Sequence, residues 1–196
     1  AAVCHALFGG DAAYWTVRVG DREAENAVWT YAAPYDEVAE IKDYVSFYWD
    51  RMDHWYEEDE EVFVHPRDPH VRLDVLDSAR PVRIMVAGQV VAESTGARML
   101  FETGLPTRYY LPRDDVRMEL LKSSERHSDC PYKGSADYWH LNLNGEVFED
   151  LVWSDPDPVT EAARIKGYLC FFDEKVEAVE VDGQVMERPV TKWSAN

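Results

Sequence analysis

The sequence predicts an α+β protein, mainly β, in which bent antiparallel sheets carry one main helix in each of two related repeats. Three observations support this fold class. Residues 10–47 recur without a gap as residues 134–171, alternating apolar and polar runs end in turn dipeptides, and residues 158–172 show helical spacing. We therefore expect two copies of one folding unit.

The strand predictions are clearest in the second copy. Residues 82–86, 98–102, 108–111, 138–143 and 176–181 carry β-forming residues and are separated by Gly or Pro. Asn144-Gly145 tolerates the positive φ angles of a type I′ turn and is the strongest hairpin signal. Ala87-Gly88 and Asp182-Gly183 predict two further turns.

The helix prediction covers residues 158–172. Asp157 is suited to capping, and Pro158 fits the first helical position. The apolar residues then recur at spacings of three and four, which indicates an amphipathic stripe. That stripe consists of Ala162, Ile165, Leu169 and Phe172.

The domain boundaries follow from the repeat. We expect an incomplete first repeat at 1–60, an acidic and Pro-containing connector with a partial strand echo at 61–81, a complete second repeat at 82–188, and a tail at 189–196. The strands missing from the first repeat could be permuted, supplied by a partner chain or truncated. We favour truncation.

Composition excludes several partners. The 196-residue chain has a net charge of −18, which disfavours nucleic acid and anionic membranes. No apolar run reaches the roughly 20 residues that span a bilayer. Three cysteines lack paired spacing, which predicts buried thiols in a reducing, cytoplasmic setting. Two of these cysteines, Cys4 and Cys130, stand at nearly corresponding places in the repeat.

The repeat separates shared residues from those of one copy. The shared aromatics indicate a core or a pocket wall, and they are Tyr14, Trp15 and Trp29, which align with Tyr138, Trp139 and Trp153. The ionisable residues of the second copy alone are Lys133, His140 and Asp155, which align with Gly9, Thr16 and Tyr31. Chemistry is therefore expected in the second copy.

Three motifs carry a family resemblance. The segments CPYKGSADYW at 130–139, RYYLPRDDVRMELL at 108–121, and VW-S-DPDP with IKGY further on resemble the family called domain of unknown function 427. Some collections label that family nucleotidyltransferase-like. The resemblance implies a β-tent fold and no established activity. Its better understood β-tent relatives often bind zinc through two Cys-x-x-Cys pairs, which this chain lacks, so we expect neither a metal nor a cofactor.

The candidate site is an aromatic pocket with cationic groups that would bind a small ligand. The alternative is that the aromatics form the core and that Arg113 and Arg117 pair with acids at the surface. The catalytic candidates are Lys133, Cys130 and Asp155, without an assigned reaction. The ligand-binding candidates are Tyr109, Tyr110, Arg113, Arg117, Lys133, Tyr138, Trp139 and Trp153.

Three functions remain open. The first is binding of a small anionic or aromatic metabolite, with catalysis unassigned. The second is a non-enzymatic assembly module, in which the first repeat is completed across a homodimer. The third is a nucleotidyltransferase-like enzyme, although Lys-Gly-Ser at 133–135 is not a P-loop and no magnesium-binding carboxylate pair is evident.

Overall fold

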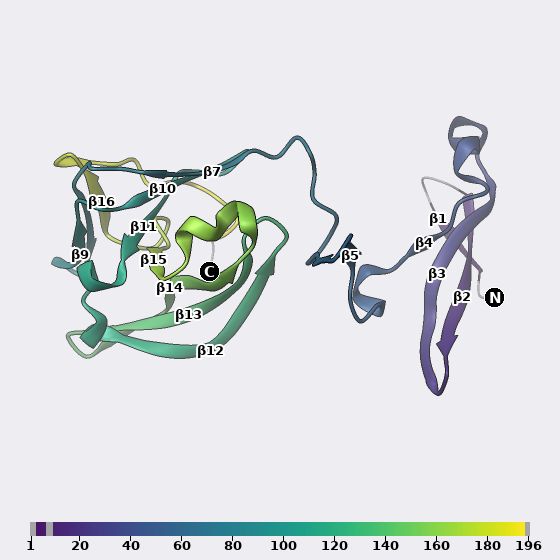
Figure 1. Cartoon of the computed structure of the whole chain (residues 1–196), viewed down its shortest axis with the longest axis horizontal. Coiled ribbons are helices and arrows are strands. Elements are labelled where there is room, and N and C mark those ends of the chain that lie inside the picture. Colours follow the sequence, from purple (N-terminus) through teal and green to yellow (C-terminus); the bar gives the residue numbers. More distant parts are fainter. Residues whose placement is uncertain (1–2, 7–9, 195–196) are drawn as a thin grey trace. The chain divides into compact units, whose positions relative to one another are not determined.

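The protein forms two compact units, Ala1–His65 and Pro66–Asn196, in a computed structural model that describes residues 3–6 and 10–194. Side chains are described for residues 10–194, so those of Cys4 and His5, and all of Gly9, lie outside the described part. The two units are considered separately. Both consist mainly of antiparallel β-sheet, so the fold is mainly β (Figure 1).

The larger sheet of the second unit has seven strands in the order β12-β13-β14-β15-β11-β10-β7. Its long strands lie side by side and curve together (Figure 1). Its members are β7 (Leu73–Asp77), β10 (Arg98–Glu102), β11 (Arg108–Pro112), β12 (Leu121–Cys130), β13 (Gly134–Leu143), β14 (Glu146–Pro158) and β15 (Tyr168–Phe171). Strand β7 falls in the segment for which the sequence predicts a connector with a strand echo.

The second sheet of this unit has the order β17-β16-β8-β9. Its strands are β8 (Val82–Val86), β9 (Gln89–Ser94), β16 (Ala178–Val181) and β17 (Gln184–Val185). Alternate residues of β8 are buried, as the sequence pattern predicts for a strand with one face on the core. Residues of both sheets form one apolar cluster that includes Tyr110, Leu169 and Phe171.

The first unit contains a sheet of four strands in the order β1-β2-β3-β4. These strands are β1 (Val3–Ala6), β2 (Gly10–Val19), β3 (Arg22–Pro34) and β4 (Ser46–Phe47). The acidic run at 57–61 contributes to a short hairpin of β5 (Tyr56–Glu57) and β6 (Glu60–Glu61). Two 3₁₀ helices, η1 (Asp36–Ile41) and η2 (Trp49–Arg51), complete the unit's regular elements among the described residues.

The two units repeat the same strand pairing at the offset seen in the sequence. Gly10 pairs with Pro34 as Gly134 pairs with Pro158, and each pairing shifts register at the same two places. The offset extends into the preceding strand, where Ala6 pairs with Gly10 as Cys130 pairs with Gly134. The backbone counterpart of Cys130 is therefore Ala6, which lies two residues after Cys4 in β1.

Gly134 is required by the backbone at the start of β13. Its φ is +95°, and a Cβ there would lie 2.9 Å from the carbonyl oxygen of Asp157. Gly10 shows the same arrangement, with φ +102° and 2.9 Å to the oxygen of Ala33. An added methyl group would meet rigid strand backbone in both units.

The predicted helix at 158–172 is wrong. Pro158 ends β14, and the helical part is only the 3₁₀ helix η5 (Thr160–Ile165), which begins without a side-chain cap from Asp157. Gly167 then adopts φ +81°, and residues 168–171 form β15 between β14 and β11. The apolar spacing came from a short turn followed by a buried strand, because a strand covered on both sides also reads as an apolar run.

The remaining helical elements are short. They are the 3₁₀ helices η3 (Arg113–Asp115) and η4 (Met118–Leu120). The expected main helix of each repeat is therefore absent from the described residues, and short 3₁₀ helices are found instead. The 3₁₀ helix η5 contacts both β7 and β14 (Figure 1). Within the described part of the chain, no helix has the length and apolarity needed to cross a membrane.

Candidate functional site

A buried ion pair lies at the start of β11. Both terminal nitrogens of Arg108 donate to Glu174, from Nη1 to Oε2 at 2.8 Å and from Nη2 to Oε1 at 2.5 Å. The Thr191 hydroxyl donates a further hydrogen bond of 2.6 Å to Oε1. Burial alone would raise the pKa of Glu174, but the bonds from Arg108 and Thr191 hold it below its ordinary value. This carboxylate is therefore ionised and fully paired.

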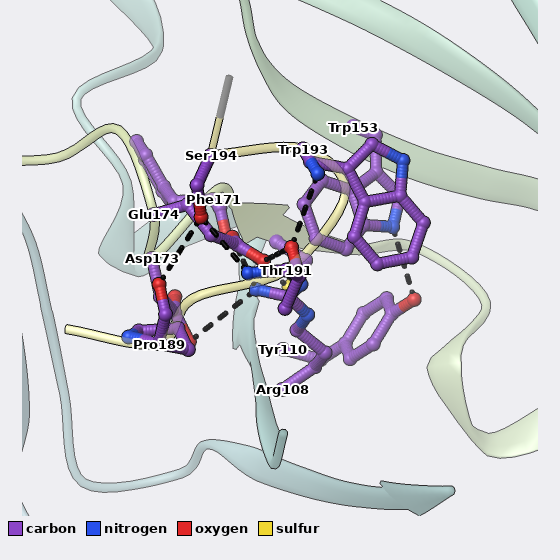
Figure 2. Close-up of polar contacts among 11 residues, drawn as sticks. Arg108, Tyr110, Trp153, Phe171, Asp173, Glu174, Pro189, Thr191, Trp193 and Ser194 are labelled. Atoms are coloured by element: carbon purple, nitrogen blue, oxygen red, sulfur yellow. Dashed lines mark hydrogen bonds and ion pairs between the residues drawn. The ribbon is translucent and has the colours of Figure 1, made fainter. Parts of the chain in front are cut away.

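Two indole rings lie against the same guanidinium. The Arg108 Cζ atom is 5.7 Å from the ring centre of Trp153 and 5.6 Å from that of Trp193. A cation over an aromatic face is attracted by the ring quadrupole. We call Arg108, Trp153, Asp173, Glu174, Thr191 and Trp193 the Arg108 cluster, and Figure 2 shows how residues from β11, β14, the segment after β15 and the C-terminal segment contribute to it.

Asp173 is the second carboxylate of the Arg108 cluster. Its nearest approach to Arg108, from Oδ2 to Nη1, is 3.7 Å, which is beyond hydrogen-bonding distance. The residue is 6% exposed. Burial raises its pKa to about 7, with Glu174 adding to the rise and Arg108 opposing it. Asp173 therefore exchanges a proton close to neutral pH.

A cavity of about 220 Å³ lies beside this carboxylate. We call it the Tyr109 cavity, because Tyr109 and Asp173 both line it together with residues from 106–107, 177–179 and 186–189. Burial, followed by the charge on Asp173, raises the pKa of the Tyr109 hydroxyl. The cavity thus combines an aromatic ring, apolar and charged side chains, and a buried acid.

A second buried network lies deeper in the unit. The indole Nε1 of Trp153 donates to the Tyr110 hydroxyl at 3.1 Å, and that hydroxyl donates to Asp155 Oδ2 at 3.0 Å. Burial raises the pKa of Asp155 to about 6, although Tyr110 and Lys133 oppose the rise. Lys133 itself pairs with the largely buried carboxylate of Glu102. Burial lowers the pKa of Lys133, but the nearby Cys130, Glu102 and Asp155 more than offset this, so the ammonium stays charged.

The structure divides the residues of the expected pocket among several places. Tyr109 lines the cavity, whereas Tyr110, Trp153 and Lys133 belong to the buried network. The hydroxyl of Tyr138 lies 2.8 Å from Ser128 Oγ.

The two arginines expected in the pocket, Arg113 on η3 and Arg117 just before η4, lie elsewhere. The guanidinium of Arg113 lies 5.2 Å from the ring centre of Trp139. Arg117 donates to Glu119 at 2.9 Å on the exposed surface. Cys130 is a half-buried free thiol at the end of β12. These arginines and this thiol do not line the Tyr109 cavity.

The charged members of the Arg108 cluster, Arg108, Asp173 and Glu174, were not among the residues predicted from the sequence. A usable signal existed, because Asp173 and Glu174 follow the apolar run Leu169 to Phe172 directly. Two acids next to a buried strand require a partner or a special environment. At the repeat offset Asp173 aligns with Trp49, so it is also particular to the second unit.

The described side chains contain no group of three His, Cys, Asp or Glu residues arranged to hold a metal ion. Within the Arg108 cluster, Arg108 and Glu174 are paired with each other, and Asp173 can act as donor or acceptor depending on its proton.

Fold and site together define a β-sheet protein with a buried charged cluster beside a small cavity. The chain belongs to the family described as Domain of unknown function (DUF427), whose model matches residues 3–58 and 74–182. The name of that model carries a nucleotidyltransferase label. A comparison with curated proteins found no match.

Proposed function

We propose that the protein binds a small organic molecule in the Tyr109 cavity. The observation that carries this proposal is Asp173, a buried carboxylate at the wall of a cavity of about 220 Å³. Ligand sites are concave and mainly apolar, with few convergent polar groups. The volume is below the roughly 300–1,000 Å³ of pockets for drug-sized ligands, which supports a small ligand.

The cationic side chains in and near the cavity already have hydrogen-bonding partners, which affects the kind of ligand that can bind. Lys133 is paired with Glu102, and Arg108 is paired with Glu174. Arg188 lines the cavity but donates to the carbonyl oxygens of Val176 and Glu177 at 2.7 and 3.1 Å. An aromatic ligand suits this cavity better than an anion, because these cations already have partners.

A screen of small metabolites by ligand-observed NMR on the full chain tests the proposal. The matched variant is Ala178→Leu, which adds three carbon atoms at the cavity wall. We expect ligands that bind the parent protein and lose binding in Ala178→Leu. A substitution on the exposed part of β14, Val147→Thr, serves as the control and should leave binding unchanged. Absence of ligands, or ligands that bind Ala178→Leu equally well, would refute the proposal.

Catalysis is not assigned. Asp155 and Lys133 lie in a paired and buried network, which supports a structural duty for both. For Cys130, the remaining catalytic candidate, we propose no reaction.

The second candidate function is self-association through the first unit. Val45 is 57% exposed, whereas its counterpart Leu169 is fully buried, and Ile41 and Ile165 differ in the same way. Exposed apolar patches mark interaction surfaces. A homodimer in which this face packs against a second copy would explain the difference.

Light scattering on the purified full chain tests this candidate. We expect a dimer whose dissociation constant rises when Val45→Asp places a charge on the apolar face. The matched control Glu40→Gln changes an exposed residue of η1 and should leave the dimer intact. A monomer at all concentrations would contradict self-association.

The remaining proposals concern fold type and surroundings. A β-tent is our proposal for the arrangement of the second unit, supported by its two antiparallel sheets around one core. A cytoplasmic location is supported by the free thiols of Cys130 and Cys170. The net charge of −18 supports the proposal that nucleic acid is not a partner.

A further inference from the structure

The buried charges of the Arg108 cluster do not balance. It contains one guanidinium and two carboxylates, and all three residues are less than 8% exposed. Glu174 receives both short bonds from Arg108, while Asp173 remains 3.7 Å away. The one guanidinium near Asp173 is already bonded to Glu174 through two short hydrogen bonds, so the Asp173 carboxylate is only weakly compensated and would be stabilised by a proton or a positive ligand.

Asp173 also lies at the wall of the Tyr109 cavity, so a ligand there can approach its carboxylate. We propose that the Tyr109 cavity takes a small primary amine in its ammonium form, whose charged group pairs with the Asp173 carboxylate. This inference rests on the proposed function and adds the chemical class of the ligand.

The rest of the cavity fits an amine with an apolar body. Glu177 and Glu187 contribute two exposed carboxylates at the cavity, and these favour the approach of a cation. Tyr109, Met186 and Pro106 supply an aromatic ring and apolar surface. An ammonium group near a tyrosine face gains further attraction.

Binding of an ammonium ion would release a proton from Asp173. Burial raises the pKa of this carboxyl group, Arg108 favours its ionised form and Glu174 opposes ionisation. With the pKa of Asp173 at about 7, the ionised fraction falls about tenfold from pH 8 to pH 6. The facing groups are Arg108 and Tyr109 of β11, Cys170 of β15, Glu174 beside it, and Glu177, Glu187 and Arg188 at the cavity.

Calorimetric titration of the full chain with 2-phenylethylamine and its neutral analogue 2-phenylethanol tests the inference. We expect the amine to bind the parent protein at pH 8 at least about tenfold more tightly than the alcohol, because a charged hydrogen bond is added. Amine affinity should fall about tenfold at pH 6, where Asp173 is mostly protonated, and heats measured at pH 6 in buffers of different ionisation enthalpy should report proton release. The affinity for the alcohol should not change with pH.

The variant Asp173→Asn keeps the size of the side chain and removes its charge. We expect it to lose about tenfold in amine affinity together with the pH dependence, while the alcohol binds as before. Asp114→Asn makes the same change at an exposed site on η3 and should alter neither. If Asp173→Asn does not fold, proton release on amine binding to the parent protein still tests whether the ammonium group pairs with the Asp173 carboxylate.

The outcomes separate this inference from the proposed function. Equal affinity for the amine and the alcohol, with loss of both in Ala178→Leu, would overturn the amine class and leave cavity binding in place. Amine binding at pH 6 without proton release, or amine affinity unchanged in Asp173→Asn, would also overturn the inference. If neither probe binds the parent protein, the inference that the ligand is an amine is refuted. The metabolite screen then determines whether the Tyr109 cavity binds any small molecule.

Discussion

Thr16 and His140 make the same hydrogen bond in the two units. The Thr16 hydroxyl oxygen accepts from the backbone N–H of Asn26 at 3.2 Å, and His140 Nδ1 accepts from that of Asp150 at 3.1 Å. Asn26 and Asp150 both have a positive φ, 51° and 48°, where the strand pairing is irregular. His140, which aligns with Thr16 in the sequence, therefore satisfies the backbone of a bulge.

The first prediction uses this equivalence. His140→Thr should retain most of the free energy of unfolding, because the first unit uses threonine at the same place. His140→Val has the shape of threonine without the acceptor, and we expect it to be about 1–2 kcal/mol less stable than His140→Thr. Urea unfolding of both variants measures the difference. Equal stability of the two would show that the hydrogen bond contributes nothing.

The second prediction concerns the buried ion pair. Arg108→Met removes the cation and leaves Glu174 and Asp173 buried without it, which should lower the free energy of unfolding by about 3–5 kcal/mol. Arg108→Lys keeps the charge but cannot form both bonds to Glu174, so an intermediate loss is expected. Denaturant unfolding measures both variants.

The control for this prediction is Arg72→Met. Arg72 pairs with Asp74 on the exposed surface, where the pair contributes little. If Arg72→Met and Arg108→Met are equally destabilising, burial does not set the strength of the Arg108 pair.

The third prediction concerns pH. The pKa of Asp155 is about 6 in the folded protein and 3.8 in an unfolded chain, so the folded state binds more protons between these values. The Asp155 contribution to stability is therefore present at low pH and is lost as the pH rises through about 6. Between pH 5 and pH 7.5 this loss is about 1 kcal/mol, and Asp155→Asn should remove it.

Comparing the parent protein with Asp155→Asn at each pH isolates this contribution from those of the other acids. Asp157→Asn, on the exposed end of the same strand, should leave the pH dependence of unfolding as it is in the parent. A parent protein and Asp155→Asn variant with parallel pH profiles would contradict the raised pKa.

The fourth prediction concerns Gly134. Gly134→Ala should destabilise the protein by about 1–3 kcal/mol more than Gly145→Ala, because only the first adds a methyl group against backbone. Gly145 also has a positive φ, +84°, but its Cβ position is open. Thermal unfolding of the two variants gives the comparison, and similar melting temperatures would argue against the steric cause.

Much of the β structure was predictable from local signals. The Asn144-Gly145 turn joins β13 and β14 as expected, and Asp182-Gly183 joins β16 and β17. The repeat in the sequence matches the repeated strand register. The helix was wrongly predicted because Leu169 to Phe171 lies on a central strand, whose burial depends on neighbours remote in sequence.

The site was harder to predict. Aromatic and cationic residues could be selected as candidates because their chemistry is visible in the sequence, and Tyr109 does line the cavity. Asp173 and Glu174 were missed, because their significance depends on burial beside Arg108, 66 residues from Glu174 along the chain. The ligand-binding role of the expected residues stays a prediction.

The segment 191–193 has a consequence for the order of events during synthesis. Thr191 and Trp193 complete a cluster whose other members, from Arg108 to Glu174, are translated earlier. While Thr191 and Trp193 are still inside the ribosome, Arg108, Asp173 and Glu174 lack the contacts that these two residues make in the folded protein. The second unit therefore reaches its final packing only after the segment predicted as a tail has emerged.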